Sequence, residues 1–350
     1  MSKSFWFVLG LIVASVVCSG QVIMTEYPVP SPNSNLLGIT AGQDGNLWFA
    51  ENSANKIGRI TPAGVVTGEF PISGSGPTTI TRAPDGNLWF TEYFGNRIGR
   101  VTPTGVVTEY SAGGNPYGIT AGSDGSLWFT EYSGNNIVRM TNSGVVTGVF
   151  STPTPGSNPL MITSGPDSNL WFTEVGGNQI GRISTDGMID EFSIPTSGSS
   201  PEGITAGPDG NLWFVEAGGN KIGRITTAGV VTGEFLIPTP GSNPVGITSG
   251  VDGNLWFTEA FSSQIGRLTT LGIITEFLTP TPGSQPELIT TGPDGNLWFT
   301  ENVANNIGKL RRIPFDKDEC KNGGWRTLYR ADGTQFKNQG DCIQYVNTGK

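Results

Sequence analysis

The chain has 350 residues and a net charge of −9, and it contains 52 glycines, 24 prolines and no histidine. Hydrophobic residues make up 36% of the chain, so we expect a packed core rather than global disorder. Residues 21–310 contain 11 basic and 24 acidic residues, a net charge of −13, which lacks the basic footprint of a nucleic-acid partner.

The first twenty residues have the pattern of a secretory signal peptide. Lys3 precedes an apolar run over residues 5–17, and the small residues Ser19 and Gly20 follow. We therefore expect cleavage after Gly20 and a secreted or periplasmic protein. The run is shorter than the roughly 20 residues of a transmembrane helix, so no membrane span is expected. Cys18 leaves a lipid anchor as an alternative, against which the bulky residue before it argues.

One octapeptide, DGNLWFTE, returns seven times in identical or nearly identical form between Asp44 and Glu301. Its tryptophans lie 39 to 43 residues apart, a period that is typical of propellers and solenoids. These tryptophans are Trp48, Trp89, Trp128, Trp171, Trp213, Trp256 and Trp298. The body of the chain is therefore an array of seven similar units.

Each unit has the pattern of four short strands joined by turns. In the second unit we expect strands over residues 79–82, 87–92, 97–102 and 106–110. The Asp-Gly turns favour hairpins because glycine adopts positive φ without a Cβ clash. Leu88 and Phe90 point to one face of their strand and Trp89 to the other, so both faces are apolar, as in a sheet packed between two sheets.

The two ends of the array indicate a closed ring. Residues 22–27 match the fourth-strand pattern, whereas the seventh unit provides only three strands up to Leu310. The N-terminal strand can therefore complete the last sheet and remove the open edges. The sequence predicts an all-β fold, a seven-bladed β-propeller of four-stranded blades over residues 21–312, and we expect a monomer.

Residues 313–350 follow the array as a small segment with a net charge of +3 from residue 311 onward. Cys320 and Cys342 remain once Cys18 leaves with the signal peptide, and an even pair in an exported chain favours a disulfide over two free thiols. The loop of about 23 residues would contribute on the order of 3 kcal/mol in the chain-entropy model. We expect a disulfide-closed appendage docked on the ring.

The charged residues of the repeat are expected to be structural. Each aspartate lies in a tight turn, where its side chain accepts hydrogen bonds from the turn backbone. Each glutamate ends a second strand; Glu51, Glu92 and Glu216 face basic residues, but the other four face Asn or Gln, so we expect bonds to loop or neighbouring-blade N–H groups instead. In the alternative, a few of these glutamates contribute to a ligand or cation site. The basic residue aligned with each tryptophan is expected to stack on the indole.

The residues at the channel rim, where the first strands begin, vary between units. They are Leu37, Thr78, Tyr117, Leu160, Glu202, Val245 and Glu287. Variable positions on a rigid repeat scaffold are the usual place for function. We therefore predict that a small molecule, peptide or glycan binds at this loop-rich rim near Tyr117, Glu202 and Glu287; a solvent-lined channel is the alternative.

Two segments, "NPYGITAGSDGSLWFTE" and "GNKIGRITTAGVVTGEF", closely resemble the virginiamycin B lyase (streptogramin lyase) family of seven-bladed propellers. The resemblance extends over residues 22–310. It implies enzymes that open cyclic depsipeptides at an ester bond by elimination, with Mg²⁺ polarising the substrate and a histidine as base. The family's histidine positions fall on Val245 and Glu287, and its glutamate in the last blade matches Glu301.

The absence of histidine separates two functional expectations. Elimination needs a base that works near neutral pH, a role that histidine fills. The first expectation is therefore a non-catalytic binding protein whose ligand contacts Tyr117, Glu202, Val245 and Glu287. The alternative is an Mg²⁺-dependent C–O lyase with Glu287 and Glu301 as catalytic residues and Glu301 as metal ligand. Glu287 could act as base only if burial or neighbouring acids raised its pKa.

Overall fold

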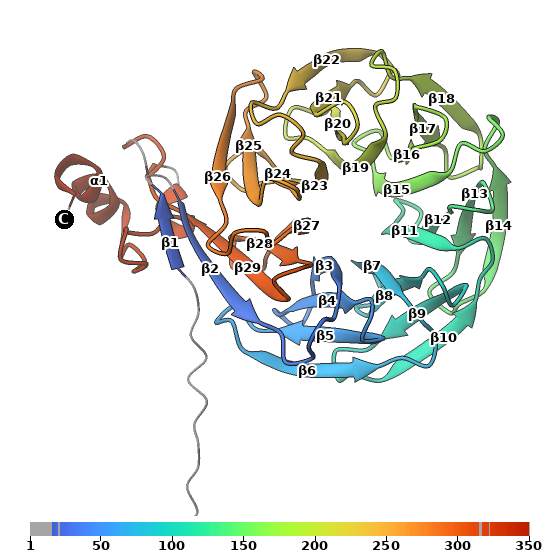
Figure 1. Cartoon of the computed structure of the whole chain (residues 1–350), viewed down its shortest axis with the longest axis horizontal. Helices are drawn as coiled ribbons and strands as arrows, with labels where there is room; N and C mark the ends of the chain where they lie inside the picture. Colours follow the sequence, from blue (N-terminus) through green and yellow to red (C-terminus); the bar gives the residue numbers. More distant parts are fainter. Residues whose placement is uncertain (1–15, 20–21, 315–316, 322, 350) are drawn as a thin grey trace, which may run out of the picture.

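The structure is a computed structural model that describes residues 16–19, 22–314, 317–321 and 323–349. The described residues form seven antiparallel sheets, arranged as the blades of a propeller around a central channel (Figure 1). The predicted all-β fold with seven blades is confirmed. In the described part of the chain, no helix has the length and apolarity needed to cross a membrane.

The first six blades each consist of four consecutive strands, with the first strand next to the channel (Figure 1). The strands are β3 (Leu36–Ala41), β4 (Leu47–Glu51), β5 (Lys56–Ile60) and β6 (Val66–Pro71) in blade 1; β7 (Pro77–Arg82), β8 (Leu88–Glu92), β9 (Arg97–Val101) and β10 (Val107–Ser111) in blade 2; β11 (Pro116–Ala121), β12 (Leu127–Glu131), β13 (Asn136–Met140) and β14 (Val146–Ser151) in blade 3; β15 (Pro159–Ser164), β16 (Leu170–Glu174), β17 (Gln179–Ile183) and β18 (Ile189–Ser193) in blade 4; β19 (Pro201–Ala206), β20 (Leu212–Glu216), β21 (Lys221–Ile225) and β22 (Val231–Leu236) in blade 5; and β23 (Pro244–Ser249), β24 (Leu255–Glu259), β25 (Gln264–Leu268) and β26 (Ile274–Leu278) in blade 6. The strands predicted for the second unit match blade 2 to within two residues at each end.

Blade 7 closes the ring with both ends of the array. It contains β27 (Pro286–Thr291), β28 (Leu297–Glu301), β29 (Asn306–Arg312) and the N-terminal β2 (Val22–Pro28). β2 pairs with β29 from Val22↔Arg312 to Pro28↔Asn306, as predicted.

A fifth strand, β1 (Val16–Ser19), adds to the outer edge of β2. This strand was not expected, because it lies within the predicted signal peptide; the rest of that segment, residues 1–15 and 20, lies outside the described residues. Cleavage after Gly20 stays a prediction, and it would leave blade 7 with four strands.

The core lies between blades rather than within them. Trp48 of blade 1, for example, packs with Leu88 and Phe90 of blade 2, and all three side chains are fully buried. Each repeat tryptophan also stacks on an aromatic ring of its own fourth strand, with ring centroids 5.3 to 5.9 Å apart. Both faces of the second strand are therefore buried by apolar contacts, which is why the octapeptide is apolar on both sides.

The turn aspartates are structural, as predicted. Asp44 accepts hydrogen bonds from the backbone N–H of Asn46 at 3.2 Å and from the indole N–H of Trp48 at 3.1 Å. The indole bond was not foreseen. It recurs in six blades, but blade 2 lacks it, and Trp89 Nε1 has no partner among the described residues. The aspartate thus holds the tight turn and the buried indole together.

The repeated basic residues stack on the tryptophans, as predicted, and five of them also join neighbouring blades. The seven cationic centres lie 4.9 to 5.9 Å from the indole centroids. Arg59 of blade 1 donates to the carbonyl of Pro103 in blade 2 at 2.7 Å. Lys309 of blade 7 donates to the carbonyl of Pro62 in blade 1 at 2.7 Å, so the same bond also closes the ring.

The C-terminal appendage is a small unit with its own core. The predicted disulfide joins Cys320 and Cys342, and both cysteines are buried with Leu328 and Phe336. The appendage contains a 3₁₀ turn, η1 (Gly324–Thr327), and one helix, α1 (Gln339–Thr348), and it sits outside blade 7 (Figure 1).

The appendage docks on the rim that carries the tight turns. The backbone N–H of Tyr329 donates to the carbonyl of Arg312 at 2.9 Å, and Asn296, in the Asp-Gly turn of blade 7, donates to the Tyr329 hydroxyl at 3.1 Å. Arg312, the last residue of β29, also donates to the Thr327 hydroxyl of the appendage at 3.1 Å. The opposite, loop-rich rim is therefore left uncovered by the appendage.

Candidate functional site

The loop-rich rim is formed by two kinds of loop, as predicted. In blade 1 the loop after the second strand donates to the loop that leads into the first strand, from Asn52 N–H to Asn35 at 3.2 Å and from Ser53 N–H to Ser34 at 2.9 Å. The start of each first strand pairs with the end of the second, for example Pro77 with Glu92. The residues at these two positions therefore share one rim.

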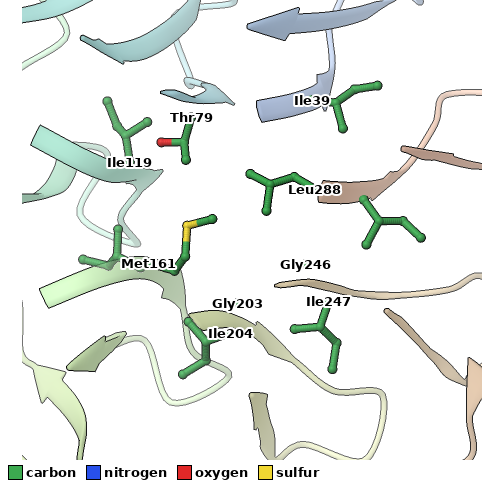
Figure 2. A pocket seen from close by; sticks show the side chains of 11 residues that line it. Ile39, Thr79, Ile119, Met161, Gly203, Ile204, Gly246, Ile247 and Leu288 are labelled. Atoms are coloured by element: carbon green, nitrogen blue, oxygen red, sulfur yellow. The ribbon is translucent and has the colours of Figure 1, made fainter. Parts of the chain in front are cut away.

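The channel below this rim is apolar. Each first strand contributes one isoleucine, and the seven are Ile39, Ile80, Ile119, Ile162, Ile204, Ile247 and Ile289. Six of them line a pocket of about 130 Å³ together with Thr79, Met161, Gly203, Gly246 and Leu288 (Figure 2). Backbone polar groups share this wall with the alkyl side chains, so the solvent-lined channel stays the alternative.

The predicted ligand-binding residues lie at the rim end of the first strands, which we call the channel mouth; none of the four is among the residues that line the pocket. Tyr117, Glu202, Val245 and Glu287 each lie two residues before a channel isoleucine, on the side of the loop-rich rim. The first strands that carry them are held in place from the neighbouring blade, because the Thr91 hydroxyl donates to the carbonyl of Tyr117 at 2.6 Å. The mouth is thus built on strands rather than on mobile loops.

Three of these residues lie on the first strands of blades 5, 6 and 7, and these strands are in close contact. A Cβ atom on Gly203 would lie 2.5 Å from the carbonyl oxygen of Val245, and one on Gly246 would lie 2.7 Å from that of Glu287. Only glycine permits this approach, so β19, β23 and β27 bring Glu202, Val245 and Glu287 side by side. Tyr117 belongs to blade 3, two blades before Glu202.

Electrostatic interactions link Glu202, Glu287 and Tyr117. Burial raises the pKa of Glu202 to about 7. Burial and then the charge of Glu202 raise the pKa of Glu287 to about 7, while a hydrogen bond with Asn302 lowers it. Burial, followed by the charges of both glutamates, raises the pKa of the Tyr117 hydroxyl. The three groups therefore face the same space at the channel mouth.

Aromatic side chains next to Tyr117 complete one side of the mouth, and sequence analysis missed them. The Tyr93 ring lies edge-on to Tyr117 at 5.9 Å, to Phe94 at 5.1 Å and to Tyr132 at 6.3 Å between centroids. Phe94 remains 66% exposed. A signal existed, because the residue after the octapeptide varies between units, as the first-strand positions do. Those residues are Asn52, Tyr93, Tyr132, Val175, Ala217, Ala260 and Asn302.

Glu301 lies apart from this group. It ends β28 and is fully buried. Burial and then the charge of Glu26, on the closing strand β2, raise the pKa of Glu301 to about 9. The two residues that the resemblance makes catalytic, Glu287 and Glu301, thus occupy different environments, one at the channel mouth and one inside the blade.

These surroundings of Glu301 do not suit Mg²⁺. Magnesium requires near-octahedral oxygen ligands and usually keeps several waters, whereas Glu301 is fully buried and its pKa is raised to about 9 by burial and by the charge of Glu26. Across the ranges that the structure describes, no group of three or more His, Cys, Asp or Glu side chains could hold a metal ion. The donor set here does not fit the cofactor that the resemblance implies.

The other octapeptide glutamates resemble Glu301 rather than Glu287. In six blades the glutamate at the end of the second strand is buried and lies near a second glutamate on the fourth strand. The six fourth-strand glutamates are Glu26, Glu69, Glu109, Glu191, Glu234 and Glu276. Burial is the largest cause that raises the pKa of the inner residues, to about 7 for Glu51, about 8 for Glu174 and about 9 for Glu301.

The loop N–H groups are bound by the outer glutamates, not by the inner ones as predicted. Ser31 N–H donates to Glu69 at 2.9 Å, and equivalent bonds reach the other five outer residues. The basic residues expected opposite the inner glutamates also bind the outer ones: Lys56 pairs with Glu69 at 3.5 Å. The prediction was wrong because the outer carboxylates, on the fourth strands, take up the loop N–H groups, whereas the inner carboxyls are buried at the ends of the second strands.

Blade 3 is the exception that fits the prediction. Its fourth strand carries Val149 in place of the outer glutamate. Here Glu131 itself accepts from the loop, from Gly113 N–H at 3.2 Å, and from the Asn136 side chain at 2.9 Å. The octapeptide glutamate therefore binds the loop where no second carboxylate is present to do so.

Comparison with known proteins identifies the family. A model of the virginiamycin B lyase family matches residues 22–236 and 231–313. The chain is similar to a streptogramin B lyase structure, with 40% identity and a TM-score of 0.79 over 83% of this chain and 98% of that chain. It is also similar to a catalytically inactive virginiamycin B lyase variant from Staphylococcus aureus with quinupristin, with 43% identity and a TM-score of 0.78 over 83% of this chain and 99% of that chain.

A virginiamycin B lyase from Bacillus licheniformis is 48% identical over 44 residues, which are 13% of this chain and 15% of that protein. This match is local, whereas the family model and the two structures extend over the whole ring. They cover the channel mouth and all seven blades. The chain belongs to the virginiamycin B lyase family.

Proposed function

We propose that this family member is an exported protein that binds a ligand at the channel mouth of the loop-rich rim without lyase catalysis. The observation that carries the proposal is the absence of histidine from all 350 residues. The Staphylococcus aureus relative with quinupristin is a catalytically inactive variant in which alanine replaces one histidine. This relative, which lacks one histidine and is inactive, was solved with quinupristin, and that supports ligand binding without turnover in the present chain.

The channel mouth suits ligand binding in its shape and chemistry. The apolar pocket of about 130 Å³ can hold a small hydrophobic group, and half-buried Tyr117, Glu202 and Glu287 offer polar contacts at its opening. An apolar pocket with a few convergent polar groups is the usual form of a small-ligand site. Export follows from the signal-peptide pattern of residues 1–20.

One observation favours the alternative, a C–O lyase. The pKa of Glu287, raised to about 7 by burial and by the charge of Glu202, is in the range that suits a general base. In such an elimination the base removes a carbon-bound proton, a C=C bond forms and the ester C–O bond breaks to release a carboxylate. Glu301 would not assist, because it is buried beside Glu26.

The deciding experiment incubates the purified protein with a type B streptogramin and Mg²⁺. A ring opened by elimination has the same mass as the intact ring, so liquid chromatography with tandem mass spectrometry is needed. We expect only intact antibiotic. A linear product that disappears on chelation and in the Glu287→Gln variant would overturn the proposal in favour of the lyase.

Binding is measured in parallel with a panel of cyclic peptides, linear peptides and glycans. We expect saturable binding of at least one compound, and a loss of at least tenfold in affinity when Tyr117→Ala opens the mouth. The control is Asp186→Asn, because Asp186 is an exposed turn residue on the opposite rim. Equal affinity in both variants, or no binding at all, would contradict a rim site.

A further inference from the structure

Among the residues that the structure describes, no basic side chain pairs with the carboxyl of Glu202 or of Glu287. In the described ranges, Glu202 has no hydrogen bond or ion pair, and burial alone shifts its pKa. In the same ranges, the carboxyl of Glu287 has a hydrogen bond with Asn302, which is uncharged. By contrast, Lys56, Arg97 and Lys221 on the same rim each pair with an outer glutamate. An acidic pair left without a counter-charge in a half-buried site favours an external cation.

The opposite side of the mouth is aromatic. Tyr117 and Tyr132 come from blade 3, and Tyr93 and Phe94 from blade 2, with ring centroids 5.1 to 6.3 Å apart. The charges of Glu202 and Glu287 both reach the Tyr117 hydroxyl, so the acidic and aromatic sides face each other. Aromatic faces attract ammonium and guanidinium groups, with about 0.5 to 2 kcal/mol per contact.

The pocket beneath selects for size. It measures about 130 Å³ and is walled by isoleucines, Met161 and Leu288 (Figure 2). An apolar cavity of roughly 150 Å³ is known to hold one benzene ring. The pocket therefore matches a single aromatic ring or a branched alkyl group, and it offers such a group burial away from water.

A bare metal ion fits this mouth poorly. Calcium takes 6–8 oxygen ligands and magnesium a rigid octahedron, but Glu202 and Glu287 are two carboxyls beside an alkyl side chain, Val245. No third acidic, His or Cys side chain joins them in the part of the chain that is described. The aromatic side would also be unused by a metal.

We propose, building on the proposed function, that the rim site binds an organic cation. Its ammonium or guanidinium group lies between Glu202 and Glu287 and faces the aromatic side formed by Tyr117, Tyr93 and Tyr132. Its apolar body, a single ring or a branched alkyl group, enters the isoleucine-lined pocket. The ligand class is thus an amine or guanidine with a compact hydrophobic body, either free or as the cationic end of a larger molecule.

The test uses a matched pair of probes, phenethylammonium and the neutral 2-phenylethanol, and measures binding by ligand-observed NMR. The titration is run about one pH unit above the pKa of the two glutamates, where both are ionised and the amine is still charged. We expect the amine to bind at least tenfold more tightly than the alcohol. Glu202→Gln and Glu287→Gln should each weaken amine binding at least fivefold and leave alcohol binding within twofold.

Two controls separate specific recognition from attraction to an acidic protein. Asp186→Asn removes one charge from the opposite rim and should leave amine affinity unchanged within twofold. Thermal unfolding of the unliganded variants shows that each is folded; neither Glu202→Gln nor Glu287→Gln removes an ion pair, so their Tm should match or exceed that of the wild type.

The proposal is overturned if amine and alcohol bind equally, if neither probe binds, or if Asp186→Asn weakens the amine as much as Glu202→Gln does. Tighter binding of Mg²⁺ alone, with displacement of the amine, would also overturn it. These failures differ from a failure of the proposed function. If the cation preference is absent but peptides or glycans still bind in a Tyr117-dependent way, the rim remains a ligand site of another chemical class.

Discussion

Replacing Glu174 with glutamine isolates the pH response of one buried carboxyl. Glu174 ends β16 and is fully buried, and burial is the main cause that raises its pKa to about 8. A hydrogen bond with Ser157 lowers this pKa, and the charge of Glu191 raises it. In the unfolded chain the pKa is about 4.3. Between the two values the carboxyl is protonated in the folded state and ionised in the unfolded state.

The sign and size of the effect follow from this difference. Because the folded state binds the extra proton, the stabilising contribution is complete below the unfolded pKa and is lost as the pH rises toward about 8. The free energy of unfolding falls by about 1.4 kcal/mol per pH unit, or about 3 kcal/mol between about pH 5 and about pH 7. Glutamine does not titrate, so we expect the Glu174→Gln variant to gain about 3 kcal/mol relative to the wild type over this range.

The assay is urea unfolding at several pH values with the disulfide intact, followed by the fluorescence of the buried tryptophans. The matched control is Glu131→Gln, because blade 3 has Val149 instead of an outer glutamate and Glu131 accepts hydrogen bonds from Gly113 and Asn136. The Glu131→Gln variant shows what the loss of an octapeptide carboxyl does to the fold where no outer glutamate lies beside it. A Glu174→Gln profile that runs parallel to that of the wild type would refute the assignment of a proton to the inner carboxyl.

Two further predictions concern the structural framework. Asp124→Ala should lower the free energy of unfolding by about 1 to 3 kcal/mol, because it leaves the buried indole N–H of Trp128 unpaired; Asp85→Ala should cost less, since Trp89 lacks this bond, and equal losses in urea titrations would contradict the reasoning. Cys320→Ser should make the appendage sensitive to proteolysis while the Tm of the ring shifts little, because the disulfide lies in the separate core of the appendage; a large fall in the ring's Tm would show instead that the ring depends on it.

The framework was predictable because its signals are local and repeated. The tryptophan spacing, the Asp-Gly turns and the apolar second strands specify one blade, and seven copies specify the ring. Closure was also predictable, because residues 22–27 carry the fourth-strand pattern that the last unit lacks. The positions of Tyr117, Glu202, Val245 and Glu287 at the channel mouth follow directly from the repeat register.

The features that sequence analysis missed depend on contacts between distant segments. Glu301 lies beside Glu26 only because the closing strand comes from the other end of the chain, so its burial next to a second carboxyl has no local signal. The aromatic side of the mouth brings Tyr93 and Tyr132 together from loops of two blades. The site on which the appendage docks was likewise not predictable, since it depends on the end of β29 and on the Asp-Gly turn of blade 7.

The measurement that tests the account most directly is chromatography with tandem mass spectrometry of a type B streptogramin after prolonged incubation with the wild-type protein and Mg²⁺. The account predicts that the antibiotic is recovered entirely in its cyclic form, because the chain has no histidine to act as base and Glu301 is buried within blade 7. Recovery of the linear isomer from the wild type, and of the cyclic form alone from Glu287→Gln, would contradict it.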